Sequence, residues 1–307
     1  MQKVIIIVGP TAVGKTETGL KLAKMLNTEI VSGDSMQIYQ EVAIGTAKPT
    51  KEEQAQVKHH LIDKRSVFEE YSVKDFVKSA NEVIEKMDQE NKIPIIVGGT
   101  GFYINALVNK MQLGEPGEYK TSVDQKWEEF LEKNGPQKLW EQLHKVDPAA
   151  SEKISPNNSR RTLRALTVIE RTGQLFSRQQ KQIMPRYDAL IIGLNSERQL
   201  VYDRINRRVD LMMEKGLLKE AKFIYENRAR EHQVIQAIGY KEFFPYFEGE
   251  KSLEECVAKL KQASRKYAKR QITYFKHQLP VHWVDSLQDP VSEMKIKKLV
   301  NNFLKKV

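Results

Sequence analysis

The sequence predicts an α/β protein in which helices flank a parallel β-sheet and a mainly helical domain is inserted. Three observations support this fold class. Short apolar runs alternate with helical patterns over the first hundred residues, which is typical of a parallel sheet covered by helices. The runs are continuously apolar, as in strands buried on both faces. A long stretch without strand character then precedes another apolar run, DALIIGL at 188–194.

The predicted elements follow in chain order. Strands are expected at 3–8, 29–32, 93–97 and 188–194, with an edge strand at 282–285. Helices are expected at 15–26, from Ser72 onward, at 196–227 with a break near Gly216, and at 252–277. Two of these helices open with the spacing of a capping box, in Ser72-x-x-Asp75 and Ser252-x-x-Glu255, which favours helix initiation at both serines.

Residues 111–186 are polar and helical in pattern and contain no strand signal. Because strands of one sheet bracket this block, we expect it to be an insertion in the main domain. The predicted organisation is therefore a core domain formed by 1–110 and 187–307, including the C-terminal helices, and a helical insertion domain at 111–186.

Composition narrows the possible classes of protein. With 307 residues, 40% of them hydrophobic and 29% charged, the chain suits a globular protein. The single cysteine, Cys256, excludes an internal disulfide framework and a Cys-rich zinc finger and fits a reducing cytoplasm. No apolar run reaches the roughly 18 residues of a membrane span. We expect a cytoplasmic protein with no membrane association, acting as a monomer.

The positive charge is concentrated in the later part of the chain. Residues 1–100 carry 13 Lys or Arg against 14 Asp or Glu, so the +10 net charge resides in the remainder. Residues 160–186 contain seven basic residues and one acid, and 259–276 contain seven basic residues and no acid. Two such tracts indicate a polyanionic partner; solvated helix faces are the alternative.

A complete P-loop motif follows the first predicted strand and opens the first predicted helix, the context that supports its assignment. Its residues are Gly9, Pro10, Thr11, Ala12, Val13, Gly14, Lys15 and Thr16. Backbone N–H groups and the helix N-terminus favour phosphate oxygens, Lys15 supplies a charge, and Thr16 supplies a hydroxyl for Mg²⁺. The core is therefore predicted to be P-loop NTPase-like, and Mg²⁺ is the expected cofactor.

Two further loops are expected beside the P-loop, because the carboxyl ends of parallel strands meet at one edge of the sheet. Asp34 follows the second strand, where its carboxylate can accept a proton or hold a metal, or simply cap a turn together with Ser35. The segment Gly98-Gly-Thr-Gly101 follows the next strand. Its glycines allow close approach to a ligand, or merely a tight turn.

Basic and aromatic side chains in the second half suggest further contacts. Arg204 and Arg208 share one helix face at i, i+4; they could clamp a diphosphate, or pair with Glu197 and Asp210 on the surface. The segment 264–275 interleaves Lys and Arg residues with tyrosines. Exposed tyrosines beside basic side chains suit the binding of unstacked RNA bases, whereas tyrosines that pack inward would have a structural role.

His59 and His60 adjoin each other with no cysteine or acid at metal-ligand spacing, so a structural role is favoured.

Taken together, these motifs resemble the bacterial type of the tRNA dimethylallyltransferase (tRNA isopentenyltransferase) family. The matching segments are GPTAVGKT (9–16), GDSMQIY (33–39), IGTAKP (44–49), HHLID (59–63), GGTGFY (98–103), RRTLRALTVIERTG (160–173), AIGYKE (237–242) and AKRQITYF (268–275). They span nearly the whole chain in order. Val13 stands where the family often has Ser, and Tyr274 where Trp is common.

The resemblance implies transfer of a dimethylallyl group from dimethylallyl diphosphate to N6 of adenosine 37, in the anticodon stem-loop of tRNA. It implies that the P-loop holds the diphosphate, Asp34 is the general base, Thr100 contacts the reacting end and Arg208 neutralises the leaving group. The tRNA contacts that it implies are Asp34, Ser35, Met36, Gln37, Arg160, Arg161, Thr162, Leu163, Arg164, Gly239, Tyr240, Lys241, Lys269, Arg270, Gln271 and Tyr274, and it places some of them in the insertion domain.

Two other functions share part of this pattern. A P-loop kinase acting on a nucleotide or metabolite would explain the first hundred residues but not the two basic tracts. A non-catalytic RNA-binding module would explain the tracts but leave a complete P-loop without a task.

Overall fold

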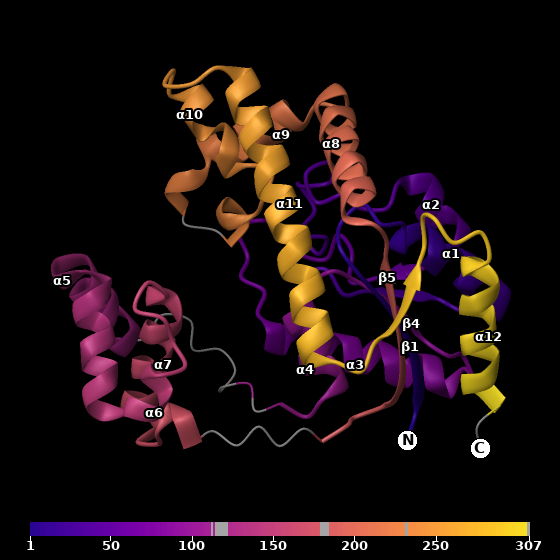
Figure 1. The fold of residues 1–307 in the computed structure, drawn as a ribbon, viewed down its shortest axis with the longest axis horizontal. Helices are drawn as coiled ribbons and strands as arrows, with labels where there is room; N and C mark the ends of the chain where they lie inside the picture. Colours follow the sequence, from indigo (N-terminus) through magenta and orange to yellow (C-terminus); the bar gives the residue numbers. More distant parts are fainter. Residues whose placement is uncertain (112, 114–121, 179–183, 231–232, 306–307) are drawn as a thin grey trace. The chain divides into compact units, whose positions relative to one another are not determined.

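A parallel six-stranded sheet organises the computed structural model, which describes residues 1–111, 113, 122–178, 184–230 and 233–305 (Figure 1). The strands within these residues are β1 (Lys3–Val8), β2 (Ile30–Ser32), β3 (His59–His60), β4 (Ile95–Val97), β5 (Asp188–Asn195) and β6 (His282–Asp285). Their order is β3-β2-β4-β1-β5-β6, and every neighbouring pair is parallel. The predicted fold class is confirmed, and 282–285 is an edge strand as expected.

β1 lies between β4 and β5, at the point where the order in which strands are added to the sheet reverses. Ile6 pairs with Ile96 of β4 on one side and with Ile191 of β5 on the other. The strands that follow β1 directly lie on the β4 side, whereas β5 and β6 extend the sheet on the opposite side. Ligands of such sheets bind beyond the carboxyl ends of the strands at this reversal, which is where the P-loop begins.

The helices of the core domain connect and cover the strands. They are α1 (Lys15–Leu26), α2 (Lys51–Gln56), α3 (Val73–Gln89), α4 (Gly101–Val108), α8 (Arg198–Glu214), α9 (Leu217–Glu226), α10 (Phe244–Phe247), α11 (Leu253–Gln278) and α12 (Ser292–Lys305). Ser72 and Ser252 form the predicted capping boxes with Asp75 and Glu255. Gly216, with φ of 97°, separates α8 from α9 as expected.

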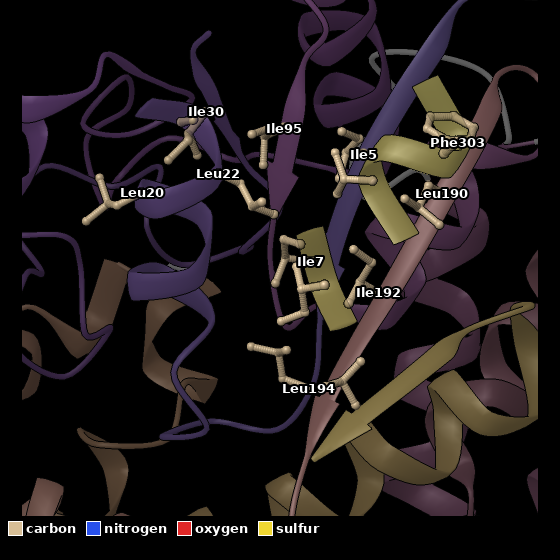
Figure 2. Close-up of a cluster of buried hydrophobic side chains, with 14 of the residues drawn as sticks. Ile5, Ile7, Leu20, Leu22, Ile30, Ile95, Leu190, Ile192, Leu194 and Phe303 are labelled. Carbon is tan, nitrogen blue, oxygen red and sulfur yellow. The ribbon is translucent and has the colours of Figure 1, made fainter. Parts of the chain in front are cut away.

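One hydrophobic layer lies between the sheet, α1 and α12 (Figure 2). Ile5 and Ile7 of β1 and Ile192 of β5 alternate along their strands toward this layer, as the two-residue period of a strand requires. Leu22 of α1 and Phe303 of α12 cover them. On the opposite face, Ile104 of α4 packs beside Ile96 of β4, close to Gly33. The strands are thus buried on both faces, which explains their continuous apolar sequences.

The inserted segment has a separate core. The chain divides into two compact units, one of Met1–Lys110 with Met184–Val307 and the other of Met111–Ile183. The second unit contains α5 (Ser122–Val146), α6 (Pro148–Ser151) and α7 (Ser159–Thr172), whose buried side chains include Leu139, Leu143 and Leu166. The boundary falls before Met184 rather than at 187, because Met184 O accepts a hydrogen bond from Lys110 N at 2.8 Å.

Short 3-10 turns complete the described secondary structure. They are η1 (Phe176–Arg178), η2 (Arg228–Arg230), η3 (Gln233–Gln236) and η4 (Lys241–Phe243). Among the helices of the described ranges, none combines the length and apolar character needed to cross a membrane.

Candidate active site

The P-loop forms a cradle between β1 and α1. Gly14 has φ of 102°, a left-handed conformation that a side chain would disfavour, and it precedes the first turn of α1. Backbone N–H groups at a helix N-terminus and the helix dipole together favour an anion. The predicted phosphate-binding loop therefore has the geometry that its sequence implies.

This cradle opens into a cavity of about 500 Å³. The cavity is lined by the P-loop from Thr11, by Asp34 and Gln37 after β2, by Gly98 and Gly99 after β4, and by side chains of α8. Gly98 and Gly33 approach so closely that a Cβ on Gly98 would lie 2.3 Å from Gly33 O. The three loops that the sequence placed at one edge of the sheet do converge there.

Two cations, Lys15 and Arg208, line the cavity close enough to act on each other electrostatically. Burial, followed by the nearby Arg208 guanidinium, lowers the pKa of Lys15 to about 7, and Asp34 opposes this shift. Burial is also the main cause of a lowered pKa for Arg208. Lys15 Nζ donates to Pro10 O at 2.8 Å. A bound diphosphate would restore the charged form of Lys15, so this part of the cavity is suited to an anion.

The arginines of α8 lie on the P-loop. Arg208 Nη1 donates to Thr11 Oγ1 at 3.3 Å, and Arg204 Nε donates to Ala12 O at 2.8 Å. Arg204 and Arg208 do not form the alternative surface network with Glu197 and Asp210. Asp210 pairs with Lys261 at 2.6 Å, and Glu197 accepts from Gln288 at 3.1 Å.

Asp34 both caps a turn and lines the cavity, so it fits the structural and the functional interpretation of its sequence position. Met36 N donates to Asp34 Oδ1 at 2.9 Å, which is a turn cap. The carboxyl group nevertheless also lines the cavity. Burial raises the pKa of Asp34, while backbone hydrogen bonds and the charge of Lys15 oppose the shift. A carboxylate with a raised pKa is a stronger proton acceptor than a solvated one.

Thr100 connects two of the loops. Its Oγ1 accepts from Ser35 N at 3.0 Å and lies 3.3 Å from Ser35 Oγ. Tyr267 of α11 reaches the same region: burial raises the pKa of its hydroxyl, and the charge of Asp34 acts in the same direction. Tyr267 therefore packs toward the site rather than standing free on the surface.

The predicted tRNA contacts separate into exposed and buried residues. Six of them are exposed in the described structure: Arg160, Arg161, Arg164, Lys241, Lys269 and Arg270. Asp34, Ser35, Met36 and Gln37 are partly exposed. Thr162 is fully buried and donates to Asn158 O at 3.1 Å, while Leu163 packs against the core of the second unit. These two side chains have structural positions within α7.

Tyr240 and Gly239 were also predicted to contact tRNA, and both are buried. Tyr240 OH donates to Glu220 Oε1 at 2.8 Å, and a Cβ on Gly45 would lie 2.6 Å from this hydroxyl. Tyr274 packs on Gly101, and its hydroxyl accepts from Asn105 Nδ2 at 3.1 Å. A sequence motif can identify these residues as part of the site, but it does not predict whether their side chains are buried.

Glu220 was not identified from the sequence. Its carboxylate accepts from the backbone N–H groups of Ala43, Ile44 and Gly45 at 2.8 to 2.9 Å. The loop that follows supplies Thr46, Ala47 and Pro49 to the cavity wall. No local pattern distinguishes this glutamate from Glu226, the other acid of α9, because its partners lie about 175 residues earlier.

The two adjacent histidines have different surroundings. His60 Nε2 lies 2.5 Å from Glu29 Oε2, and Glu29 also pairs with Lys58 and Lys92. His59 lines the cavity, with Nδ1 donating to Val57 O at 2.7 Å. Together they form the short strand β3, consistent with a structural role.

The donor set around the cavity fits Mg²⁺ better than a metal held by protein alone. Thr16, Ser32 and Asp34 supply oxygen atoms to the cavity wall. In the part of the chain that the structure describes, no three His, Cys, Asp or Glu residues gather to hold a metal. Mg²⁺ suits such a site, because it commonly takes one or two protein oxygens together with substrate phosphates and water.

Comparisons with known proteins agree with this geometry. The IPP transferase family model matches residues 37–278. The chain is 69% identical over 307 residues to the tRNA dimethylallyltransferase of Lactobacillus johnsonii, covering 100% of each chain. It is 68% identical to that of Lactobacillus gasseri, covering 100% of this chain and 99% of the relative.

Solved structures give the same result. The tRNA isopentenylpyrophosphate transferase of Bacillus halodurans superposes with a TM-score of 0.75 at 43% identity, over 99% of this chain and 97% of that one. A eukaryotic dimethylallyltransferase solved while acting on tRNA superposes with a TM-score of 0.82 at 32% identity, over 99% of this chain and 80% of that one. The chain belongs to the tRNA dimethylallyltransferase family of IPP transferases.

Proposed function

We propose that the chain transfers a dimethylallyl group from dimethylallyl diphosphate to N6 of adenosine 37 in tRNA and releases diphosphate. The observation that supports this most strongly is one cavity lined both by the cations Lys15 and Arg208 and by the carboxylate Asp34. Asp34 acts electrostatically on both cations, and its neighbour Ser35 is hydrogen-bonded to Thr100. A diphosphate leaving group and a proton-losing nucleophile require this pair of environments.

The reaction balances with these residues. The N6 lone pair attacks C1 of the allylic group, so the N6–C1 bond forms as the C1–O bond breaks, and the bonding electrons leave on a diphosphate oxygen. Lys15 and Arg208 stabilise the charge that develops there. The N6 proton passes to the Asp34 carboxylate. Mg²⁺, for which Thr16 is the proposed ligand, would add electrostatic stabilisation of the diphosphate.

The tRNA must deliver its base from outside. A base within a stacked loop is out of reach of a cavity at the sheet edge, so we propose that the nucleotide is flipped out of the stack. The exposed Lys269 and Arg270 of α11 and the exposed arginines of α7 are the proposed phosphate contacts. We propose that the chain acts as a monomer. The substrate tRNA supports a cytoplasmic location.

A transfer assay tests the function directly. The purified protein is incubated with dimethylallyl diphosphate carrying a labelled allyl group and with unmodified tRNA, and RNA-bound label is measured. A parallel reaction contains ATP and measures ADP formation. We expect label in the RNA and no tRNA-dependent ATP hydrolysis. ATP turnover without prenyl transfer would instead indicate a kinase or ATPase.

A further inference from the structure

Gln271 lies at the junction of the P-loop, the loop after β4 and helix α11. It is 5% exposed, although its neighbours Lys269 and Arg270 on the same helix are exposed. Thr11 N donates to Gln271 Oε1 at 2.9 Å, and Gln271 Nε2 donates to Gly99 O at 2.9 Å. These two bonds fix the orientation of the amide, since its oxygen can only accept and its nitrogen can only donate.

A side chain at Gly99 would collide with this amide in its present position. A Cβ on Gly99 would lie 2.3 Å from Gln271 Nε2, a distance that real Cβ atoms do not show, and 3.7 Å from Lys15 Nζ. Gly99 therefore sits between the glutamine and the phosphate-binding lysine. Its backbone φ is not left-handed, so the constraint on Gly99 is contact with Gln271 and not backbone conformation.

We infer that Gln271 is a positioning residue that holds the diphosphate cradle and the Gly98–Thr100 loop at a fixed separation. This inference rests on the proposed function and deepens it. Thr11 belongs to the cradle and also contacts Arg208. Gly99 directly precedes Thr100, which holds Ser35 next to Asp34. One amide thereby connects the segment that receives the leaving group to the segment that carries the proposed base.

The same amide is anchored on the helix that carries proposed RNA contacts. α11 lies beside α8 and reaches α4 toward its C-terminal end (Figure 1). Because Gln271 follows Lys269 and Arg270 directly, the helix presents its cations outward and its amide inward at adjacent positions. We therefore assign Gln271 a role in positioning two loops within the protein, in place of the tRNA contact that its sequence motif suggests.

The positioning role predicts a loss of rate at saturation without a loss of RNA affinity. Gln271→Met keeps the length of the side chain but removes both hydrogen bonds, and misplacement of reacting groups by about 1 Å can reduce a rate about 10²-fold. We expect the single-turnover rate at saturating substrates to fall by about 10- to 100-fold, with the dissociation constant for tRNA within about twofold of wild type. Gln262→Met, at an exposed position of α11, is the matched control and should change neither quantity.

A second pair of variants separates positioning from a general loss of stability. Gly99→Ala should slow transfer because the new methyl group displaces the glutamine amide. In the Gln271→Ala background that methyl group has room, so adding Gly99→Ala should change the rate by less than about twofold. Contacting residues couple in this way, whereas independent sites show multiplicative losses.

The outcomes distinguish the possibilities. A wild-type transfer rate for Gln271→Met, even with a lowered melting temperature, overturns the inference, as does a loss of tRNA affinity with a normal rate at saturation. Multiplicative losses in the Gly99 and Gln271 pair overturn it too. If the wild-type protein itself transfers no prenyl group, the proposed function has failed. The same variants are then compared by their pyrophosphate dissociation constants, where coupling supports the bridge and independence contradicts it.

Discussion

The two ends of the cavity are built on opposite principles. At the P-loop end, Lys15 and Arg208 stand close together, and burial with mutual repulsion holds the pKa of Lys15 down to about 7. At the other end, Asp34 Oδ1 accepts from Met36 N at 2.9 Å, and Thr100 Oγ1 accepts from Ser35 N at 3.0 Å. The first end gathers positive charge that suits an anion, whereas the second is held by hydrogen bonds within the protein. Charge should therefore control ligand binding at the first end, and proton transfer should control the reaction rate at the second.

The largest effect is expected at the second end. Asp34→Asn keeps the size of the side chain and its turn hydrogen bond but removes the proton acceptor, so the single-turnover rate should fall by roughly 10² to 10⁴. Quenched-flow measurement of labelled tRNA determines this rate. A near-normal rate would show that Asp34 only caps its turn, and rescue by added Mg²⁺ would show that it serves as a metal ligand.

The next effect is expected at the P-loop end. Lys15→Ala removes a cation from the leaving group, and loss of one such stabilising donor reduces a rate by about 10² to 10³. Affinity for tRNA should stay close to wild type, because Lys269 and Arg270 are exposed on another element. Turnover assays and filter-binding titrations measure the two quantities. Parallel loss of rate and tRNA affinity would contradict the separation of roles.

A smaller effect concerns the outer surface of α11. Replacing Lys266, Lys269 and Arg270, all exposed, by Gln should weaken tRNA binding and flatten its salt dependence. Each lost phosphate contact should remove about 0.7 to 0.9 from the slope of log K against log salt. Lys298→Gln on α12 is the control. An unchanged slope would make this face of α11 merely solvated.

A further effect concerns stability. The pKa of Lys15 is about 7 in the folded chain and lies below its ordinary value of 10.5. The charged lysine therefore destabilises the ligand-free fold fully below pH 7, and this penalty disappears as the pH rises toward 10.5. Lys15→Met should raise the melting temperature most at pH 6 and least near pH 10. Exposed Lys24→Met is the control, and a pH-independent gain would contradict the account.

The sequence predicted the sheet and the convergence of its loops because both depend on local patterns. Apolar runs mark the strands, and the P-loop motif specifies its own turn through Gly14. β3 was not predicted because two residues, His59 and His60, carry no periodic signal. The break at Gly216 was predicted because a glycine with positive φ is the usual residue at such a position.

Site residues were predicted only where a short continuous segment of sequence indicates their role. Gln271 and Glu220 act through partners 260 and about 175 residues away, so their tasks depend on the tertiary fold. Tyr240 and Thr162 were predicted to contact RNA because they lie in motifs that also contain exposed Lys or Arg residues, but both side chains are buried. Periodicity places Thr162 on the apolar face of α7, and this signal could have corrected its assignment.

The most direct test compares pyrophosphate affinity and transfer rate for Lys15→Ala and Asp34→Asn side by side. Calorimetric titration gives the dissociation constant, and single-turnover kinetics at saturating substrates gives the rate. The account predicts that Lys15→Ala loses both affinity and rate. Asp34→Asn should lose rate alone, with pyrophosphate binding unchanged or tighter because a negative charge has been removed. If the two variants lose affinity in parallel, or if Asp34→Asn transfers the prenyl group at nearly the wild-type rate, the division between a charge-absorbing end and a proton-accepting end is contradicted.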